Sequence, residues 1–103
     1  MTPRDDPTAY AERVLAVIAQ IPRGKVMSYG DVAEFMGEGS ARGGGRVLFR
    51  WGEDVPWQRV VMASGDPKPH GREEHLERLG AEGAPFVASG GRVDMPRARW
   101  DGR

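Results

Sequence analysis

Three consecutive side chains, Trp57, Gln58 and Arg59, combine groups that a plain core segment does not need. Trp57 offers a flat apolar wall with one N–H donor. Gln58 supplies a donor and an acceptor, and Arg59 supplies five donors in a rigid fork. With Val55 and Pro56 at its entrance, this stretch predicts a pocket for a flat ligand with polar edges, such as a nucleobase. The alternative is a short buried strand, in which Trp57 fills the core and Arg59 binds a carboxylate.

A second group of residues, Arg42, Arg46 and Arg50, recurs every four positions and therefore lies along one face of a helix. Residues 39–52 contain no acidic residue, so no neighbouring carboxylate relieves the repulsion between these arginines. Gly43–Gly45 would cost such a helix about 1 kcal/mol per glycine relative to alanine. Glycines are tolerated where another backbone approaches closely, so this segment suits the groove of a nucleic acid. The alternative is an ordinary solvated helix face.

The composition restricts the kinds of functional site that the chain can contain. The chain has 103 residues, enough for one domain, and its 15 basic and 15 acidic residues cancel. Any nucleic-acid site must therefore be local. Without cysteine there is no disulfide, thiolate nucleophile or cysteine zinc site, and two histidines argue against a metal centre. No apolar run is long enough for a membrane span, and residues 1–6 contain no signal-peptide core, so we expect a soluble, cytoplasmic protein.

Capping residues and apolar spacing predict four helices, over residues 6–21, 28–36, 40–51 and 72–82. Asp6 would cap the first helix ahead of a proline. Ser28 and Asp31 form the capping box of the second. Ser40 would cap the third, and Gly83 would close the fourth.

The remaining residues predict a small amount of β-structure. Val60–Met62 indicates a short buried strand, and Phe86–Met95 predicts a hairpin with a glycine turn. The tail over residues 96–103 is compatible with a packed end, a basic arm or a disordered segment. The fold class is therefore mainly α with a small β hairpin, of the helix-turn-helix or winged-helix-like kind. We expect one domain, 1–103, with its core over 6–86 and the hairpin and basic tail over 87–103.

Five segments follow one another in the order and spacing of a known family: Ile21–Val26, Ser28–Ala33, Ala41–Arg42, Pro56–Val61 and Leu79–Gly83. They resemble the DNA-binding domain of the O6-alkylguanine-DNA alkyltransferases, and the likeness runs from about Tyr10 to Phe86. In those enzymes a cysteine follows the proline of the fourth segment, and Trp57 stands there in this chain. That substitution is the mark of the alkyltransferase-like proteins, which bind alkylated DNA without removing the alkyl group.

The resemblance implies a role for each part of the site. Tyr29 matches the tyrosine that helps to rotate the target nucleotide out of the duplex. Arg42 matches the arginine that fills the gap left in the base stack. The helix that carries Arg42 would enter the minor groove, where Gly43–Gly45 would permit close approach. Trp57 would line the pocket of the extruded base.

Two sets of residues are therefore expected at the site. The DNA-binding residues are Ser28, Tyr29, Arg42, Gly43, Gly44, Gly45, Arg46 and Arg50. The lesion-pocket residues are Tyr29, Val55, Pro56, Trp57, Gln58, Arg59, Lys68 and His70. We expect no catalytic residue, no metal and no cofactor.

Three features depart from the family pattern. Gln58 replaces a histidine that in the enzymes relays a proton between the thiol and a glutamate, matched here by Glu82. Without a thiol we expect Glu82 to be structural. Gly44 replaces a helix-packing valine, which predicts a recognition helix that begins late or is mobile. The loop over residues 63–71 is shorter than the family's binding loop, so Lys68 and His70 are candidate contacts without an aligned counterpart.

The resemblance implies a monomeric, non-enzymatic protein of the bacterial nucleoid. It would flip O6-alkylguanine out of duplex DNA and present it to nucleotide excision repair. One alternative is a winged-helix regulator that reads sequence in the major groove through Arg42, Arg46 and Arg50. A second is a protein-binding adaptor whose interface is the tail around Trp100.

Overall fold

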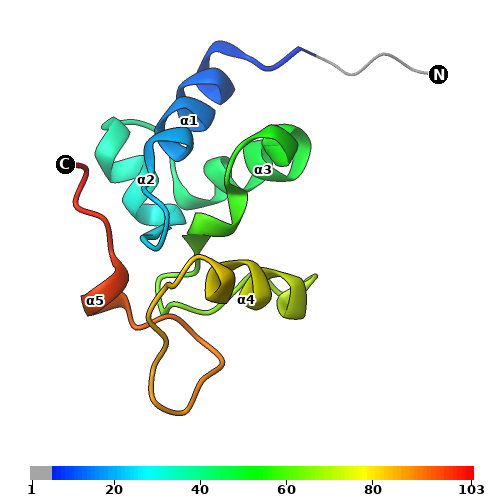
Figure 1. Ribbon diagram of the computed structural model, residues 1–103. Coiled ribbons are helices and arrows are strands. Elements are labelled where there is room, and N and C mark those ends of the chain that lie inside the picture. Colours follow the sequence, from blue (N-terminus) through cyan, green and yellow to red (C-terminus); the bar gives the residue numbers. More distant parts are fainter. Residues whose placement is uncertain (1–5) are drawn as a thin grey trace.

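The computed structural model describes residues 6–103. Three helices, α1 (Ala9–Gln20), α2 (Tyr29–Met36) and α3 (Ala41–Trp51), pack against one another. In Figure 1, α4 (Arg72–Ala81) lies on the opposite side of two short strands, β1 (Met27–Ser28) and β2 (Val60–Val61). Two turns of 3-10 helix, η1 (Gly52–Asp54) and η2 (Trp57–Arg59), join α3 to β2, and α5 (Met95–Ala98) lies near the C-terminus. The predicted mainly helical fold is confirmed.

α1 begins later than the sequence predicts. Its N-cap is Thr8, whose hydroxyl accepts a hydrogen bond from the Ala11 backbone N–H at 3.0 Å. Asp6 was therefore the wrong cap, and because aspartate and threonine are both favourable caps, residue type alone does not choose between them. The predicted apolar face of α1 is confirmed, since Val14 and Ile18 are buried.

α2 begins with the predicted capping box. Ser28 Oγ accepts a hydrogen bond from the Asp31 backbone N–H at 3.0 Å, and Asp31 Oδ2 accepts one from the Ser28 backbone N–H at 2.9 Å. The same carboxylate oxygen accepts a hydrogen bond from Arg99 Nε at 2.9 Å. The start of α2 is thereby tied to the C-terminal segment.

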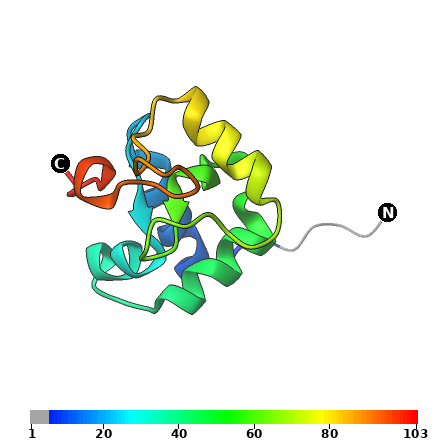
Figure 2. The same ribbon diagram turned by 90° about the horizontal axis from the view of Figure 1, so that it is seen from below.

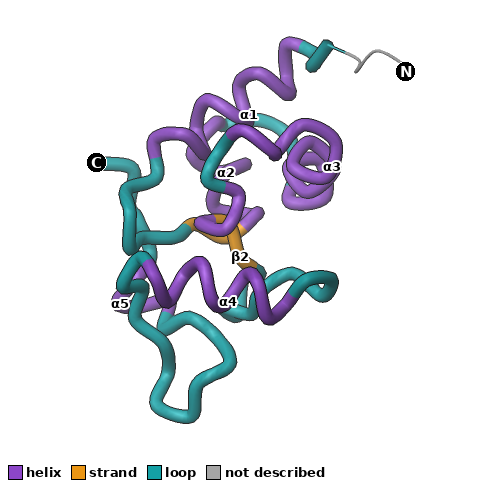
Figure 3. The backbone as a smooth tube through the Cα atoms, turned by 45° about the vertical axis from the view of Figure 1, so that its right-hand side comes forward, coloured by secondary structure: helices purple, strands orange, loops and turns teal. Residues whose placement is uncertain are grey.

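The sheet is a parallel pair that joins distant parts of the chain. Met27 pairs with Val60, and Ser28 pairs with Val61. Because neighbouring strand residues point to opposite faces, Val60 belongs to the core formed with α1, α2 and α3, whereas Val61 belongs to a second core against α4. Figure 3 shows β2 between these two groups of helices. Met62, predicted to continue the buried strand, is 43% exposed and lies beyond it.

The prediction of a hairpin over Phe86–Met95 is wrong in its strands. Within residues 6–103, this segment contains a single antiparallel bridge, between Phe86 and Val93. Two hydrogen bonds hold this bridge, from the Val87 N–H to Arg92 O at 3.1 Å and from the Asp94 N–H to Pro85 O at 2.9 Å, and the Val93 backbone N–H donates to Gly65 O at 2.9 Å. A Cβ on Gly65, whose φ is +91°, would overlap the Val93 carbonyl oxygen, so this contact requires glycine. The segment after α4 therefore runs as a loop, which Figure 2 shows from below.

The C-terminal tail is a packed end, one of the three forms that the sequence allowed. The Val26 N–H donates to Ala98 O at 3.0 Å, and the Trp100 N–H donates to Val26 O at 2.8 Å. Trp100 is 9% exposed and joins the core of α1, α2 and α3. Buried residues therefore continue past the range of 6–86 that was expected for the core.

α3 is helical from its first predicted residue. Ser40 Oγ accepts a hydrogen bond from the Gly43 backbone N–H at 3.1 Å, so the expectation of a late start is wrong. A Cβ on Gly43 would lie 2.8 Å from Tyr10 Oη, which explains that glycine by packing inside the protein. A Cβ on Gly44 would meet no atom within 4 Å outside the helix's own backbone.

Gly44→Ala is expected to stabilise the protein. Alanine is favoured over glycine inside a helix by about 1 kcal/mol, and the new methyl group meets no clash. Gly43→Ala is the control: it gains the same helix propensity, but its methyl group would lie 2.8 Å from Tyr10 Oη, so it should be less stable than Gly44→Ala. Urea unfolding of both variants measures the difference, and a destabilised Gly44→Ala would contradict the expectation.

Candidate nucleic-acid interface

A cavity of about 580 Å³ lies between α3, the start of α2 and the loop that precedes α4. Its volume falls within the range of pockets that hold small ligands. Its lining consists of Tyr29, Gly45, Leu48, Phe49, Gly52, Glu53, Trp57, Lys68, Pro69 and His70. Four of these residues, Tyr29, Trp57, Lys68 and His70, belong to the predicted lesion pocket.

Trp57 forms one wall of this cavity and is half-buried. Lys68 Nζ lies 4.2 Å from the centroid of its ring, and Arg78 Cζ lies 5.1 Å from it. The ring of His75 meets Trp57 edge-on, with 5.3 Å between centroids. Trp57 belongs to neither hydrophobic core, so the alternative in which it fills the core is wrong.

The side chain that positions this wall is a histidine that the sequence analysis did not single out. His75 is fully buried. Its Nδ1 accepts a hydrogen bond from the Lys68 backbone N–H at 3.1 Å, so the proton resides on Nε2, which donates to Gln58 O at 2.8 Å. One imidazole thus links α4, η2 and the loop that carries Lys68. The sequence does contain a signal for the burial of His75: it lies four residues before Leu79 and therefore on the same helix face as that apolar side chain.

Protonation of His75 should destabilise the folded protein. Burial lowers the pKa of His75 below its ordinary value of 6.5, although the hydrogen bond to Gln58 opposes the shift. Below about pH 6.5 the unfolded chain therefore binds a proton before the folded protein does, and the free energy of unfolding falls as the pH falls. Each unit by which the folded pKa is lowered contributes about 1.4 kcal/mol to this loss.

Urea unfolding on both sides of about pH 6.5 measures this dependence. His75→Gln removes the titrating group and should weaken the dependence below that pH. His70→Gln is the matched control, because His70 is the second of the two histidines and is exposed. An unchanged pH dependence in His75→Gln would show that another group is responsible.

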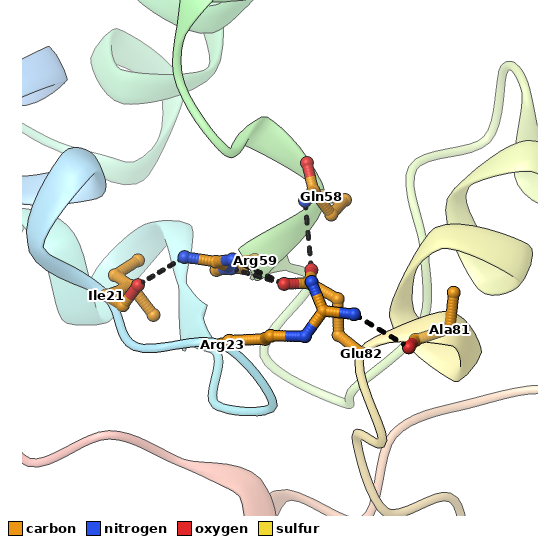
Figure 4. Close-up of polar contacts among 6 residues, drawn as sticks. All are labelled: Ile21, Arg23, Gln58, Arg59, Ala81 and Glu82. Atoms are coloured by element: carbon orange, nitrogen blue, oxygen red, sulfur yellow. Dashed lines mark hydrogen bonds and ion pairs between the residues drawn. The ribbon is translucent and has the colours of Figure 1, made fainter.

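Gln58 and Arg59 bind Glu82, as Figure 4 shows. Gln58 Nε2 donates to Glu82 Oε1 at 2.9 Å, and Arg59 Nε donates to Glu82 Oε2 at 2.8 Å. Arg59 Nη2 also donates to Glu82 Oε2, while Arg59 Nη1 donates to Ile21 O at 2.7 Å. Of the alternative interpretation, the part in which Arg59 binds a carboxylate is therefore confirmed, and only the part that places Trp57 in the core is wrong.

Half of the predicted lesion pocket lies outside the cavity. Val55, Pro56, Gln58 and Arg59 are absent from its lining, and the last two turn toward Glu82 instead. Burial would raise the pKa of Glu82, but the hydrogen bonds from Arg59 and Gln58 outweigh it, so this pKa lies below its ordinary value. Glu82 is thus an ionised partner that joins the end of α4 to η2.

The arginines of α3 line a groove beside the cavity. This groove, of about 680 Å³, is formed by Arg42, Gly45, Arg46, Phe49 and Arg50. Within residues 6–103, neither Arg42 nor Arg46 forms an ion pair with a carboxylate. Arg50 lies over the ring of Trp51, with Cζ 5.0 Å from the centroid. Arg42 and Arg46 are therefore available to bind phosphates.

A third cavity shares lining residues with both the first cavity and the groove. It has a volume of about 370 Å³ and is lined by Tyr29, Gly30, Ala41, Arg42, Gly45, Met62 and Ala63. Tyr29 thus lies between the Arg42 end of α3 and the cavity that Trp57 walls. Burial raises the pKa of Tyr29, which keeps its phenol neutral.

Three of the predicted DNA contacts are turned inward. Ser28 is 3% exposed, and its hydroxyl is engaged in capping α2. Gly43 packs against Tyr10, and Gly44 is buried. Gly45, in contrast, lines the groove and both cavities, so it is the glycine at which an incoming backbone could approach α3.

Residues 9–84 match the family model described as "6-O-methylguanine DNA methyltransferase, DNA binding domain". The chain belongs to this family. The match includes every residue that lines the cavity and the groove, and also His75 and Glu82. The site of this DNA-binding domain therefore lies wholly within the family's shared region.

Two curated relatives of this family member illustrate the similarity. The chain is 39% identical over 98 residues to the DNA base-flipping protein of Escherichia coli, a match that covers 90% of this chain and 75% of the relative. It is 30% identical to alkyltransferase-like protein 1 of Schizosaccharomyces pombe, covering 85% of this chain and 91% of the relative.

Solved structures of the family share the fold. One is S. pombe Atl1 in complex with damaged DNA containing O6-carboxymethylguanine, with a TM-score of 0.76 and 27% identity over 88% of this chain and 94% of that chain. Another is Mycobacterium tuberculosis OGT in complex with DNA, with a TM-score of 0.67 and 31% identity over 79% of this chain and 55% of that chain.

This member of the methyltransferase DNA-binding family contains no cysteine. No cluster of histidine, aspartate and glutamate side chains in residues 6–103 could hold a metal ion. In the same part of the chain, no helix has the length and apolar character needed to cross a membrane.

Proposed function

We propose that this protein binds O6-alkylguanine in duplex DNA, rotates the alkylated nucleotide out of the stack and leaves the alkyl group in place. The observation that carries the proposal is the cavity walled by Trp57, which adjoins the arginine-lined groove of α3. A base can enter such a cavity only after it has left the duplex. Further support comes from the name of the E. coli relative, a base-flipping protein, and from the Atl1 complex with alkylated DNA.

Arg42 and Tyr29 would carry the extrusion step. Taking a base out of the stack costs a few kcal/mol. The guanidinium of Arg42 is planar and exposed, so it can enter the vacated space and stack there. Tyr29 borders the route from Arg42 to Trp57, where its neutral phenol would contact the rotating nucleotide. Arg46 and Arg50 would bind the flanking phosphates.

The protein would not accept the alkyl group. Transfer needs a thiolate, and Trp57 occupies the position after Pro56 at which the alkyltransferases carry their cysteine. Glu82 binds Arg59 and Gln58, so its carboxylate serves to hold the fold of the site. The lesion would therefore remain on the DNA.

A titration with matched duplexes tests this function. One duplex contains guanine and the other O6-methylguanine at the same position, and the protein should bind the second more tightly. After incubation with DNA that carries a labelled methyl group, all label should stay on the DNA. Equal affinity for the two duplexes, with a preference that follows sequence, would support the winged-helix regulator instead. Stoichiometric label on the protein would exclude a non-enzymatic role.

Because the lesion stays in the DNA, another system must remove it, and we propose that a monomer of this protein presents it to nucleotide excision repair. A reconstituted excision nuclease should incise an O6-methylguanine duplex faster when the protein is added. The undamaged duplex is the control. No increase in incision, at concentrations that saturate the lesion, would separate lesion binding from any part in excision repair.

A further inference from the structure

The most exposed large apolar side chain in residues 6–103 is Phe49. It is 95% exposed, whereas Phe35 and Met62 are each 43% exposed. A phenyl ring gains free energy when it leaves water, and Phe49 gains almost nothing from the fold of its own chain. Such a ring gains that free energy only when a partner covers it.

The position of Phe49 indicates where that partner lies. It stands seven residues after Arg42 and four after Gly45, so the three share one face of α3. It lines both the Trp57 cavity and the arginine groove, and therefore forms the ridge between them. At 1.5 Å per residue, Phe49 is about 10 Å from Arg42 along the helix. Both residues line the same groove, so DNA bound there would contact them together.

We propose that Phe49 packs against DNA at the mouth of the cavity, where it contacts the sugar and base of the extruded nucleotide. This inference rests on the proposed function and adds a specificity-determining residue to it. The partner is duplex DNA because Phe49 is surrounded in the groove by Arg42, Arg46 and Arg50. Minor-groove proteins likewise combine basic side chains with apolar ones that enter a distorted duplex.

The contact distinguishes an extruded nucleotide from a stacked one. The arginines attract the phosphates of any duplex, damaged or not. The ridge at Phe49 meets the apolar faces of a base and its sugar only when the nucleotide has left the stack and lies across the ridge. Phe49 therefore stabilises the flipped state and strengthens the preference for lesions, whose bases leave the stack more readily.

Phe49→Ala is a clean test, because a side chain that is 95% exposed can be removed without changing the melting temperature. Binding to the O6-methylguanine duplex should weaken about five- to 150-fold, the range that stacking on one aromatic ring gives. Binding to the guanine duplex should change much less. The dependence of binding on salt should not change, because no charge is lost.

Two further variants separate aromatic contact from charge. Phe49→Trp keeps an aromatic ring and should retain the preference for the lesion. Compared with Phe49→Ala, Phe49→Lys should bind both duplexes more strongly at low salt and raise the salt slope by about one unit, without restoring the preference. If Phe49→Lys still preferred the lesion duplex, contact with the ring of Phe49 would not be the cause of that preference.

The outcomes also separate this inference from the proposed function. If the unaltered protein does not prefer the lesion duplex, the proposed function fails and the role of Phe49 fails with it. If it does prefer the lesion and Phe49→Ala keeps the same affinity and preference, only the role of Phe49 fails. Sedimentation of the protein without DNA tests whether Phe49 instead holds two copies of the chain together. A dimer that Phe49→Ala abolishes would assign the ring to a second copy and overturn the proposal.

Discussion

Glu82→Ala is expected to lower the free energy of unfolding by about 3–5 kcal/mol, the usual loss when one partner of a buried ion pair is removed. Only 5% of the Glu82 side chain and 17% of the Arg59 side chain are exposed. The variant would leave the guanidinium of Arg59 charged and shielded from water, and would also deprive the Gln58 amide of its acceptor.

The effect should extend to the proposed lesion site. Glu82 holds η2 against the end of α4, and Arg59 holds η2 against the end of α1 through Ile21 O. Trp57 is the first residue of η2, so loosening this turn would displace the wall of the cavity. Binding of the O6-methylguanine duplex should therefore weaken even at temperatures where Glu82→Ala is folded.

Glu74→Ala is the matched control for Glu82→Ala. Glu74 pairs with Arg78 in α4 at 3.1 Å, but both side chains are at least half exposed. Its loss should change the free energy of unfolding by less than about 1 kcal/mol. Urea unfolding at one pH compares the two variants. Similar small effects would mean that the Arg59–Glu82 pair contributes as little as a surface pair does.

The parts of the fold that the sequence predicted correctly are those with local chemical signals. Ser28 with Asp31, and Ser40 by itself, supply hydrogen-bond acceptors for the first turns of α2 and α3. Gly83, with a φ of +80°, follows α4 as predicted. These signals act over three or four residues, so they can be found in one sequence without knowledge of the tertiary structure.

The parts that were missed depend on contacts between distant residues. Two-residue strands have no periodicity of their own, and the pairing of Met27 with Val60 appears only when the helices between them have packed. The predicted hairpin is reduced to one bridge between Phe86 and Val93, and the Val93 N–H donates to Gly65 O in a distant loop. In both cases the hydrogen-bond partner lies far away in the sequence.

The error in the lesion pocket has a geometric cause. Trp57, Gln58 and Arg59 were taken to share one pocket, but they form a turn of 3-10 helix. Successive residues of such a helix are rotated by about one third of a turn, so three neighbours cannot face the same cavity. Trp57 faces the cavity, and the other two bind Glu82. The combination of aromatic and polar neighbours therefore indicated correctly that a pocket lies here. It led to the wrong assignment of Gln58 and Arg59 to that pocket.

Trp57→Ala is expected to remove most of the preference for O6-alkylguanine while the protein stays folded. An alkyl group on O6 removes the N1 proton of guanine and adds apolar bulk, so recognition must depend on apolar contact as well as hydrogen bonds. Stacking of a base on an aromatic ring contributes about 1–3 kcal/mol, which corresponds to about a five- to 150-fold preference. Without Trp57, the cavity loses its largest wall.

The stability of Trp57→Ala follows from the contacts of the ring. Lys68 and Arg78 lie 4.2 Å and 5.1 Å from its centroid, and such cation–π contacts contribute about 0.5–1 kcal/mol each at exposed sites. The edge contact with His75 adds about 0.5–1.5 kcal/mol. The expected loss therefore lies at or below the lower end of the roughly 3–5 kcal/mol that removal of a fully buried tryptophan causes. Thermal melts and titrations with the matched duplexes measure both effects, and Trp57→Phe, which keeps a ring, should retain part of the preference. A retained preference in Trp57→Ala would show that the wall does not sense the lesion, whereas unfolding would make Trp57 a structural residue first.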